Sequence, residues 1–377
     1  MMRAGPVGER GLDWIRGGEE AEIVLSSRVR VARNLQGFCF PGRSSDEERA
    51  DVLERVRAAA SRSTKLADGH FWDVADLDSV DRDLLVERHQ ISRDLVNSAG
   101  GSQSAFVMSE SDSCGIMVNE EDHLRLQALV GGLELYSAWR QVDQLDEEVG
   151  SLLPLAYHHQ FGFLTACPTN VGTGLRASVL IHIPGLVLTK EITKVLEGIS
   201  QVGLNYRGLY GEGSEVVGNF FQVSNQTTLG KGEEDLIDHL GRVAGKVIDY
   251  ERSARARLLS EAPAVLEDKV WRAYGILRTA RSLALEEMMN LLSGVRLGVS
   301  LKLLKSPRVE TLNEILVRGQ SAHLEREAGG SLSEQEADVC RAAFVRDKLA
   351  TDEQDAGSEP ADGFNDAKAD DGPPSGG

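Results

Sequence analysis

Apolar and polar residues alternate in several short stretches of the chain, and this period of two predicts β-strands. The first stretch, "EIVLSSRVRVARNL", alternates over Ile23 to Val31. Around "FVMSESDSCGIMVNE" two short apolar runs are separated by turn residues, which predicts a β-hairpin. We expect a further strand in "ASVLIHIPGLVLT", which Pro184-Gly185 ends, and a pair of strands in "GNFFQVSNQTTLG".

Other stretches repeat their apolar residues at the spacing of an α-helix. In "SSDEERADVLERVRAAA", Ser45 is a candidate N-cap with Glu48 three residues later, which is the arrangement of a capping box. Helices are also expected in "KEITKVLEGIS" and in "GEEDLIDHLGRVAGKVIDYERSARARLL", the second ending the first region near Ala254. The apolar stripes are Val52, Val56 and Ala59 or Ala60 in the first helix, and Leu135, Trp139, Val142, Leu145, Val149 and Leu152 in a long amphipathic helix.

The pattern changes over 263–349, where Leu, Ala, Arg and Glu recur at helical spacing and strand signals vanish. Pro307 and Gly329-Gly330 divide this region into four or five expected helices, so we predict a separate all-helical module. Residues 351–377 are acidic, rich in Gly and Pro and almost without apolar residues, so we expect a disordered tail. Residues 1–22 are expected to be flexible.

Composition narrows the class of protein. The 377 residues carry a net charge of −18, which disfavours nonspecific binding to nucleic-acid phosphates. No apolar run is long enough for a membrane span, and the start "MMRAGPVGERG" lacks the apolar segment of a secretory signal. The cysteines are too scattered for a zinc site or a disulfide framework, so we expect reduced thiols in a cytoplasmic protein: Cys39, Cys114, Cys167 and Cys340.

Arginines accompany the glycine-rich and acidic pieces of the first region. The pieces "NVGTGLR" and "GLYGEGSE" match neither a Walker loop nor a Rossmann fingerprint, and by themselves they are ordinary turns. Arg28 and Arg30 stand two apart on the first strand, so both side chains point to the same face. Together with Arg125, Arg176 and Arg207 they suggest a cage for a polyanion, because guanidinium groups bind phosphate oxygens bidentately. Scattered surface arginines are the alternative.

Three adjacent acids, Glu120, Glu121 and Asp122, lie in "MVNEEDHLRLQ" between a strand-like run and what the apolar spacing suggests is a helix. Acids at a helix N-terminus are favoured by its dipole, which explains one or two of them. Glu212 stands between two glycines with no helix to cap. Two carboxylates beside a phosphate cage would create anion-binding and cation-binding halves, as a guanidinium substrate facing ATP requires.

Cys167 precedes Pro168, so its backbone should be extended and its side chain could face a cleft. A lone cysteine is more often a small buried apolar residue. His158 and His159 are near in sequence, but their spacing does not establish a Cys–His pair, and a protease is disfavoured.

Taken together, "LSSRVRVARN", "VNEEDHLRL", "CPTNVGTGLRAS", "RGLYGEGSE" and "NQTTLG" resemble the phosphagen kinases, in the order of that family and over 23–254. Small-metabolite phosphagen kinases carry a helical domain before "SSRVR", whereas here the helical module follows the core. The chain is therefore most similar to the bacterial protein-arginine kinases, which "VWRAYGILRTAR" and "SGVRLGVSL" also resemble.

The resemblance implies an α+β fold: a catalytic domain over 23–254 with a mostly antiparallel sheet flanked by helices, then a helical domain over 263–349 for substrate binding, regulation or dimerisation. It also implies that Glu121 is the principal catalytic carboxylate, with Glu212 as its partner on the guanidinium and Cys167 on the substrate side. The implied nucleotide-binding residues are Ser27, Arg28, Val29, Arg30, Val31, His89, Arg125, Arg176, Ala177, Ser178, Val179, Leu180, Arg207, Gly208, Leu209, Tyr210, Gly211 and Glu212. Mg²⁺ is expected to be held through the ATP phosphates, so no residue is predicted as a metal ligand.

One motif departs from the family. Protein-arginine kinases bind phosphoarginine at an R-D-x-x-R-A motif, and the aligned stretch here is "ADVCRA". Asp338 and Arg341 are kept, but Ala337 stands where the first arginine would be. A lost guanidinium removes a charge-assisted contact of ~1.5–3 kcal/mol, so phosphoarginine sensing is not carried over to this chain.

The leading hypothesis is a kinase that transfers the ATP γ-phosphoryl group to arginine side chains of proteins. A kinase for free arginine or small guanidines is the alternative enzyme, which the missing N-terminal domain disfavours. A non-catalytic adaptor that binds phosphoarginine is the third, which the intact Glu121, Glu212 and arginines disfavour. The resemblance further implies a homodimer, a zinc-binding activator protein, unfolded proteins and a heat-shock repressor as substrates, and a Clp-type protease that degrades them under stress.

Overall fold

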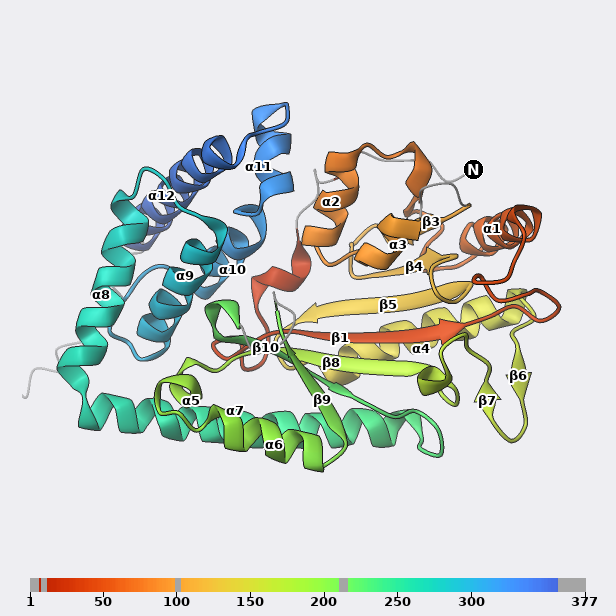
Figure 1. Ribbon diagram of the computed structural model, residues 1–377, viewed down its shortest axis with the longest axis horizontal. Coiled ribbons are helices and arrows are strands. Elements are labelled where there is room, and N and C mark those ends of the chain that lie inside the picture. The colour runs from red at the N-terminus through yellow and green to blue at the C-terminus, as the bar shows by residue number, and fades with distance from the viewer. Residues whose placement is uncertain (1–6, 8–11, 99–102, 210–215, 359–377) are drawn as a thin grey trace, which may run out of the picture.

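A long antiparallel sheet forms the centre of the molecule (Figure 1). The computed structural model describes residues 7, 12–98, 103–209 and 216–358. The sheet has eight strands in the order β2-β3-β4-β5-β1-β8-β10-β9. Their bounds are β1 Val24–Arg33, β2 His70–Asp73, β3 Ala105–Met108, β4 Cys114–Val118, β5 Leu124–Gly131, β8 Leu175–His182, β9 Leu204–Gly208 and β10 Phe220–Asn225; β6 Tyr157–His158 and β7 Gly162–Phe163 form a separate hairpin.

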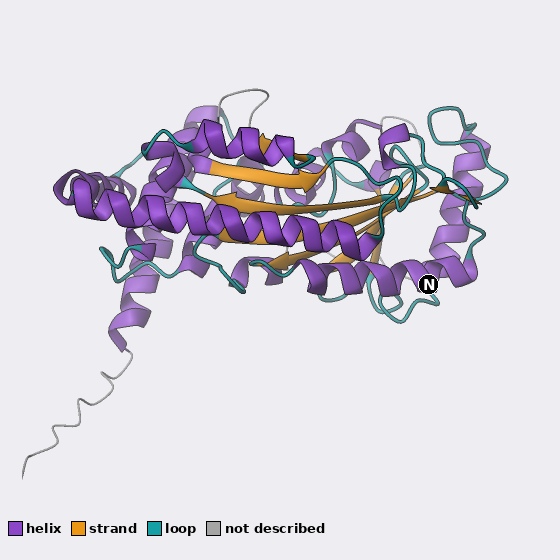
Figure 2. Cartoon of the chain, turned by 90° about the horizontal axis from the view of Figure 1, so that it is seen from below, coloured by secondary structure: helices purple, strands orange, loops and turns teal. Residues whose placement is uncertain are grey.

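Most helices of the first region cover one face of this sheet, two short ones pack against the opposite face over β3 and β4, and the chain continues into a helical region at one end (Figures 1 and 2). The helices of the first region are α1 Asp46–Ala60, α2 Ser79–Glu87, α3 Arg93–Ser98, α4 Leu135–Leu152, α5 Pro184–Leu188, α6 Ile192–Gln201 and α7 Glu233–Glu261. Those of the helical region are α8 Pro263–Thr279, α9 Leu285–Ser300, α10 Val309–Arg318, α11 Ser321–Ala328 and α12 Glu334–Ser358. The short 3-10 helices are η1 Asp13–Arg16, η2 Val74–Asp76, η3 Pro168–Asn170 and η4 Val217–Asn219. The expected α+β architecture with a helical C-terminal region is confirmed.

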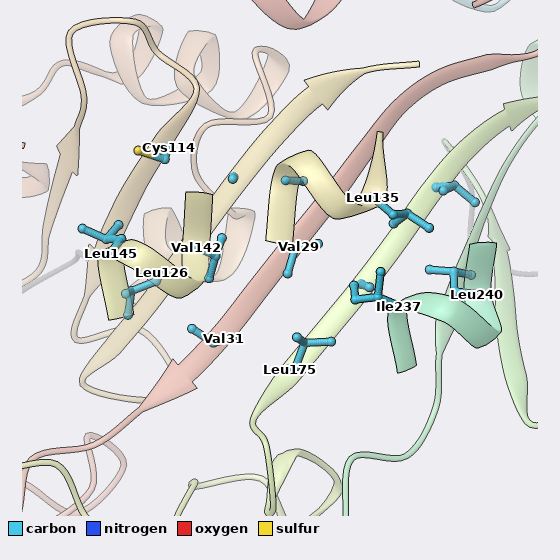
Figure 3. Close-up of a cluster of buried hydrophobic side chains, with 14 of the residues drawn as sticks. Val29, Val31, Cys114, Leu126, Leu135, Val142, Leu145, Leu175, Ile237 and Leu240 are labelled. Atoms are coloured by element: carbon cyan, nitrogen blue, oxygen red, sulfur yellow. The ribbon is translucent and has the colours of Figure 1, made fainter. Parts of the chain in front are cut away.

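The main hydrophobic core lies between the sheet and the helices α4 and α7 (Figure 3). Val29 and Val31 of β1 point into it, where they meet Val142 of α4 and Ile237 of α7. Because side chains alternate along a strand, Arg28 and Arg30 must point to the opposite face. The alternation read from the sequence therefore separates the core face of the sheet from the face that carries charge.

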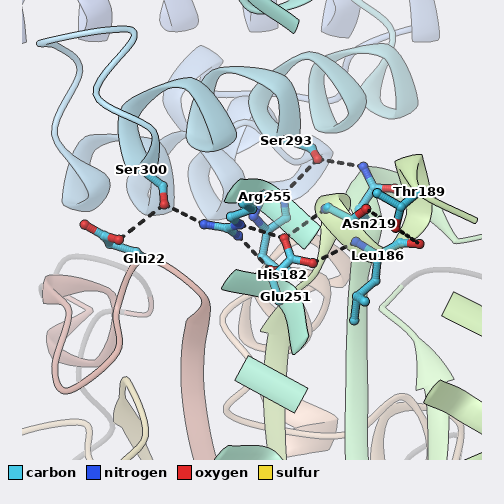
Figure 4. A network of polar contacts seen from close by, with 10 residues as sticks. Glu22, His182, Leu186, Thr189, Asn219, Glu251, Arg255, Ser293 and Ser300 are labelled. Carbon is cyan, nitrogen blue, oxygen red and sulfur yellow. Dashed lines mark hydrogen bonds and ion pairs between the residues drawn. The ribbon is translucent and has the colours of Figure 1, made fainter. Parts of the chain in front are cut away.

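The helical region is joined to the sheet by a shared apolar cluster and by buried polar groups (Figure 4). The Arg255 guanidinium donates to Glu251 at 2.6 Å, to the Ser300 hydroxyl at 2.5 Å and to the His182 carbonyl at 3.2 Å. Glu251 in turn accepts from the backbone N–H groups of Gly185 and Leu186, at the start of α5. The buried charges are thus paired, as a buried ion pair requires.

Several local predictions are confirmed. Ser45 caps α1, and its side chain accepts from the Glu48 N–H while Glu48 accepts from the Ser45 N–H. The β3–β4 hairpin, α4, α6 and α7 are present, although α7 continues to Glu261. The C-terminal region contains five helices among the described residues.

Other predictions were wrong. A short apolar run fits the spacing of a β-strand as well as that of an α-helix, so the spacing alone does not decide between them. Leu124, Leu126 and Ala128 alternate toward the core in β5, so the three acids lie in the turn between β4 and β5 and open no helix. The stretch "GNFFQVSNQTTLG" contains one strand, β10, which pairs with β8 and β9. The strand predicted in "ASVLIHIPGLVLT" is confirmed as β8, which ends at His182 just before Pro184-Gly185; the short helix α5 that begins at Pro184 was not predicted.

Both predicted flexible ends contain ordered residues. Leu12, Trp14 and Ile15 are buried in a cluster with Leu129 of β5 and Val317 of α10, which gives η1 tertiary support. At the other end α12 continues past residue 351 to Ser358. Asp352 of α12 is buried and accepts from the Arg308 side chain at 2.9 Å and from its N–H at 3.0 Å. Residues 359–377 lie outside the described part of the chain.

Candidate functional site

The open face of the sheet brings together arginines from four strands. Arg28 and Arg30 of β1 share this face, and Arg30 is paired in register with Arg176 of β8. Arg125 of β5 lies opposite Ala32, and Arg207 of β9 completes the group. We call these five side chains the arginine cage: Arg28, Arg30, Arg125, Arg176 and Arg207.

The positive charges of the arginine cage repel one another. Burial, and then the charges of Arg207, Arg125 and Arg176, lower the pKa of Arg28 to about 9. Burial and the same cluster lower the pKa of Arg30 well below its ordinary value. The Nε of Arg30 is buried and has no hydrogen-bond partner among the described residues. Like charges held together with an unused donor indicate a site for a polyanion, because an anion would relieve the repulsion and accept the hydrogen bonds.

The turn between β4 and β5 gives each of its three acids a different partner. Glu120 is buried and accepts from Arg125 Nη1 at 2.5 Å and from the Ser92 hydroxyl. Asp122 is buried and accepts from Asn34 Nδ2 at 2.6 Å and from the Ala166 N–H at 2.7 Å. Glu121 between them is exposed. Internal hydrogen bonds thus occupy the carboxylates of Glu120 and Asp122, whereas the exposed Glu121 carboxylate is accessible to a ligand.

Glu121 borders a small cleft of about 90 Å³ beside the arginine cage. Arg30, Arg125, Arg176 and Cys167 line the same cleft. Burial, followed by the neighbouring charge of Asp122, raises the pKa of Glu121 above its ordinary value. A carboxylate that binds a proton more readily is a better general base, so the cleft combines a base with an anion site.

Cys167 lies where its position before Pro168 predicts. Its backbone is extended, and the loop then turns into η3. Its Sγ lies 3.0 Å from the Thr169 hydroxyl. The hydrogen bond from the Ala166 N–H to Asp122 holds this loop against the acidic turn, so Asp122 helps to keep Cys167 at the cleft that Glu121 also lines.

His89 follows α2 with a left-handed backbone, at φ 59°. Its ring meets the Trp14 ring edge-on with 5.6 Å between centroids. Burial, then the charges of Arg28 and Arg207, lower the pKa of His89 to about 3. The imidazole is therefore neutral at working pH and lies beside the arginine cage.

The remaining residues of the predicted nucleotide site divide into groups. Val29, Val31, Ala177 and Val179 have their side chains in the main core, so only their main chain is available to a ligand. Ser178 faces the cage side and accepts from Gln222 Nε2 at 2.8 Å. Ser27, Leu180, Gly208 and Leu209 carry internal packing or strand roles, and Tyr210, Gly211 and Glu212 lie outside the described residues.

The degenerate phosphoarginine motif is far from the cage in the fold, on α12. Arg341 is buried and donates to the carbonyls of Gly319 and Leu283, both at 2.7 Å, and to Asp338 at 2.5 Å. Ala337 is buried as well. The Arg341 guanidinium thus joins α12 to the ends of neighbouring helices.

Sequence reasoning missed the separate roles of Glu120 and Asp122, and it missed Asn34, Thr169 and Asn170. Asn34 Oδ1 accepts from the His123 N–H at 2.9 Å, which fixes the turn that carries Glu121. No local pattern distinguishes these residues, because their partners are distant in sequence. The one available signal was "ARN", in which Asn34 directly follows the end of the first strand.

Comparison with known proteins identifies two matching family profiles. Residues 51–254 match the family described as ATP:guanido phosphotransferase, C-terminal catalytic domain. Residues 263–359 match the family described as Protein-arginine kinase McsB C-terminal domain. The protein-arginine kinase of Moorella thermoacetica is 46% identical over 346 residues, which cover 91% of this chain and 98% of the relative. The protein-arginine kinase of Bacillus subtilis is 42% identical over 334 residues, which cover 88% of this chain and 91% of the relative.

Solved structures share the fold over about two thirds of this chain. The duplicated taurocyamine kinase of Schistosoma mansoni with bound transition-state analogue components superposes with a TM-score of 0.57 at 26% identity. The match covers 67% of this chain and 36% of that longer chain. Lombricine kinase superposes with a TM-score of 0.56 at 24% identity, and the match covers 67% of this chain and 73% of that chain. At this identity the match is evidence of a shared fold only.

Proposed function

Because the chain belongs to the ATP:guanido phosphotransferase family, and within it to the protein-arginine kinases, we propose that the cleft beside Glu121 is where ATP meets a protein arginine. The observation that carries this proposal is the position of Glu121, at the rim of one cleft with Arg30, Arg125 and Arg176. The cation-binding carboxylate and the anion-binding cage lie side by side, as transfer between a triphosphate and a guanidinium requires.

In this proposal the arginine cage holds the ATP phosphates and stabilises the charge on the transferred phosphoryl oxygens. Glu121 orients the substrate guanidinium and accepts the proton that a guanidinium nitrogen loses as its bond to the γ-phosphorus forms. The bond from that phosphorus to the bridging oxygen breaks, and ADP leaves. Cys167 borders the guanidinium on the opposite side. Glu212 remains a predicted second carboxylate.

Magnesium would neutralise phosphate charge when it is bound. Among the residues the structure describes, no group of three or more His, Cys, Asp or Glu side chains is arranged to hold a metal ion. The donors of the cleft are mostly guanidinium groups, which suit phosphate oxygens. This donor set fits an ion carried by the nucleotide, which keeps its waters and takes few protein ligands.

The finer biological role follows from the resemblance. We infer that the substrates are unfolded proteins and a heat-shock repressor, marked for a Clp-type protease in the cytoplasm under stress, with a zinc-binding activator and a homodimeric enzyme. No helix in the described part of the chain is both long and apolar enough to cross a membrane. The open cleft supports a polypeptide substrate, because Glu121 and Thr169 at its rim are exposed.

The substrate class is tested by incubating the enzyme and ATP with an unfolded arginine-containing protein, with the same protein folded, and with free arginine. We expect phosphoarginine, detected by mass spectrometry without acid treatment, mainly on the unfolded protein. The Glu121→Ala variant should form phosphoarginine at least about a hundredfold more slowly. Turnover on free arginine but not on the unfolded protein would contradict the proposed substrate, and a wild-type rate in Glu121→Ala would contradict the proposed base.

The acidic turn predicts a specific pH dependence. Glu121 must be ionised to accept a proton, so kcat/KM should fall as pH drops through its raised pKa, above the ordinary 4.5. Asp122→Asn removes the adjacent charge, while the amide oxygen can still accept from Asn34 and Ala166. The pKa of Glu121 should then fall, and the acid limb of the pH–rate profile should move to lower pH.

The profile is measured by ADP release from pH 5 upward on wild type, Asp122→Asn and Glu47→Gln, a surface control on α1 that should leave the limb in place. An acid limb that does not move in Asp122→Asn, or that moves equally in Glu47→Gln, would contradict this account of the Glu121 pKa.

A further inference from the structure

The end of α2 lies between the helical region and the arginine cage. α2 finishes at Glu87, and His89 follows two residues later beside Arg28. The His89 N–H donates to the Val86 carbonyl at 2.9 Å, so the imidazole is attached to the last turn of α2. Any displacement of that turn must move His89 as well.

Glu87 fastens this turn to α11. Its carboxylate accepts from the Ala322 N–H at 2.9 Å and from the His323 N–H at 3.2 Å, and it lies 2.8 Å from His323 Nδ1. These N–H groups open α11 and have no partner within their own helix. The Glu87 side chain is only 10% exposed, so the contact is shielded from solvent and is stronger than a surface ion pair.

His89 has a second contact, with the Trp14 ring. The Trp14 ring, which meets His89, packs in one cluster with Val317 of α10. The Asn313 side chain of α10 donates to the Ile15 carbonyl at 2.8 Å. His89 is therefore held between two contacts, and the helical region contributes to both.

His89 needs such support. A non-glycine residue in the left-handed region has an unfavourable backbone conformation, which surrounding contacts must stabilise. The Gln90 carbonyl next to His89 accepts from Gln127 Nε2, and Gln127 is paired in register with Arg30 of the arginine cage. The Trp14 ring that meets His89 packs with Leu129, which is paired in register with Arg28. If the turn relaxed, these contacts with the strand beside Arg28 and Arg30 would be lost, and the two guanidinium groups would be less well placed for phosphate.

We propose that Glu87 is a positioning residue for nucleotide binding: by holding the start of α11 it sets the end of α2, and thereby places His89 and Arg28 in the arginine cage. The inference rests on the proposed function, in which that cage binds the ATP phosphates. Glu87 itself touches no reacting atom.

The test compares three variants by steady-state kinetics, with separate KM values for ATP and for the protein substrate. Glu87→Ala is expected to raise KM for ATP by about tenfold, because a small misplacement of binding groups is costly, with kcat within about twofold. KM for the protein should not change. Glu87→Gln keeps one acceptor oxygen and should recover most of the affinity, to within about threefold of wild type.

Asp81→Ala is the matched control. Asp81 lies on the same helix and pairs with Arg326 of the same α11, but it is at the other end of α2 from His89. It should leave KM for ATP unchanged. An equal rise in Asp81→Ala would show that general loosening of α11 is responsible, and would overturn the proposal.

A double variant tests the route through His89. Asn tolerates a left-handed backbone, so His89→Asn keeps the turn and removes the imidazole. If Glu87 acts through His89, adding Glu87→Ala to His89→Asn should raise KM for ATP by much less than tenfold. If the effects of the two substitutions on KM for ATP simply multiplied, Glu87 would not act through His89 and this part of the proposal would be overturned.

The two proposals fail in different ways. If Arg28→Met leaves KM for ATP unchanged, the cage does not bind ATP and the proposed function fails. If Arg28→Met raises it and Glu87→Ala, correctly folded by circular dichroism, does not, only the present inference fails. Should Glu87→Ala not fold, Glu87→Asp carries the test, because its shorter side chain withdraws the carboxylate from the N–H groups of α11; a KM for ATP equal to that of wild type then overturns the proposal.

Discussion

Glu121→Gln is expected to lower kcat for protein-arginine phosphorylation by about 10²–10⁴-fold, the usual contribution of a positioned general base. KM for ATP should stay within about twofold, because in the proposed function the side chain faces the guanidinium while the arginine cage holds the phosphates. Glutamine preserves size and hydrogen bonding but cannot take up the proton. ADP release in a coupled assay measures kcat, and nucleotide titration measures binding.

The neighbouring Glu120 provides the contrast. Glu120→Gln removes the buried charge that Arg125 Nη1 contacts at 2.5 Å, so Arg125 should lose its fixed position. This variant is expected to raise KM for ATP and to change kcat less than Glu121→Gln does. If both substitutions lowered kcat alike and left KM for ATP unchanged, the assignment of the proton-accepting role to Glu121 would be wrong.

Arg28→Met is expected to change binding and stability in opposite directions. Loss of one charge-assisted contact of ~1.5–3 kcal/mol should weaken ATP binding by roughly 10–150-fold. The nucleotide-free protein should nevertheless melt at a higher temperature. Burial and the neighbouring arginines lower the pKa of Arg28 to about 9, so its charged form is unfavourable in the folded state and favourable in the unfolded one. The flexible methionine side chain fills the same space without charge.

Differential scanning fluorimetry with and without ATP measures both effects. The melting temperature should rise without ATP, and the increase caused by ATP should be lost. Arg140 is an exposed residue of α4, the helix that packs on the sheet face opposite the arginine cage. The control variant Arg140→Met should change neither the melting temperature without ATP nor the increase caused by ATP. A lower melting temperature for nucleotide-free Arg28→Met would mean that its packing outweighs repulsion within the cage.

Elements supported by their own neighbours in sequence could be predicted. The capping box at Ser45 and the stripe of Val52 and Val56 are local, and α1 forms as expected. The alternation through Arg28 and Arg30 predicted both the strand and the shared face of the two arginines. Elements supported by distant partners could not be predicted. Trp14 is buried only because Leu129 and Val317 lie against it, and α12 passes residue 351 because Arg308 binds Asp352.

The three acids of the β4–β5 turn show which properties the sequence determines by itself and which depend on the tertiary structure. By itself the sequence determined the family, through the order of its motifs, the residue types of the cage and the presence of Glu121, because these are properties of the chain read in order. Only the tertiary structure decided that Glu120 holds Arg125, that Asp122 holds the Cys167 loop, and that Glu121 alone remains at the cleft. The physical reason is that a carboxylate's role depends on which donors reach it. Here those donors come from Ser92, Asn34 and Ala166, which only folding brings to the turn.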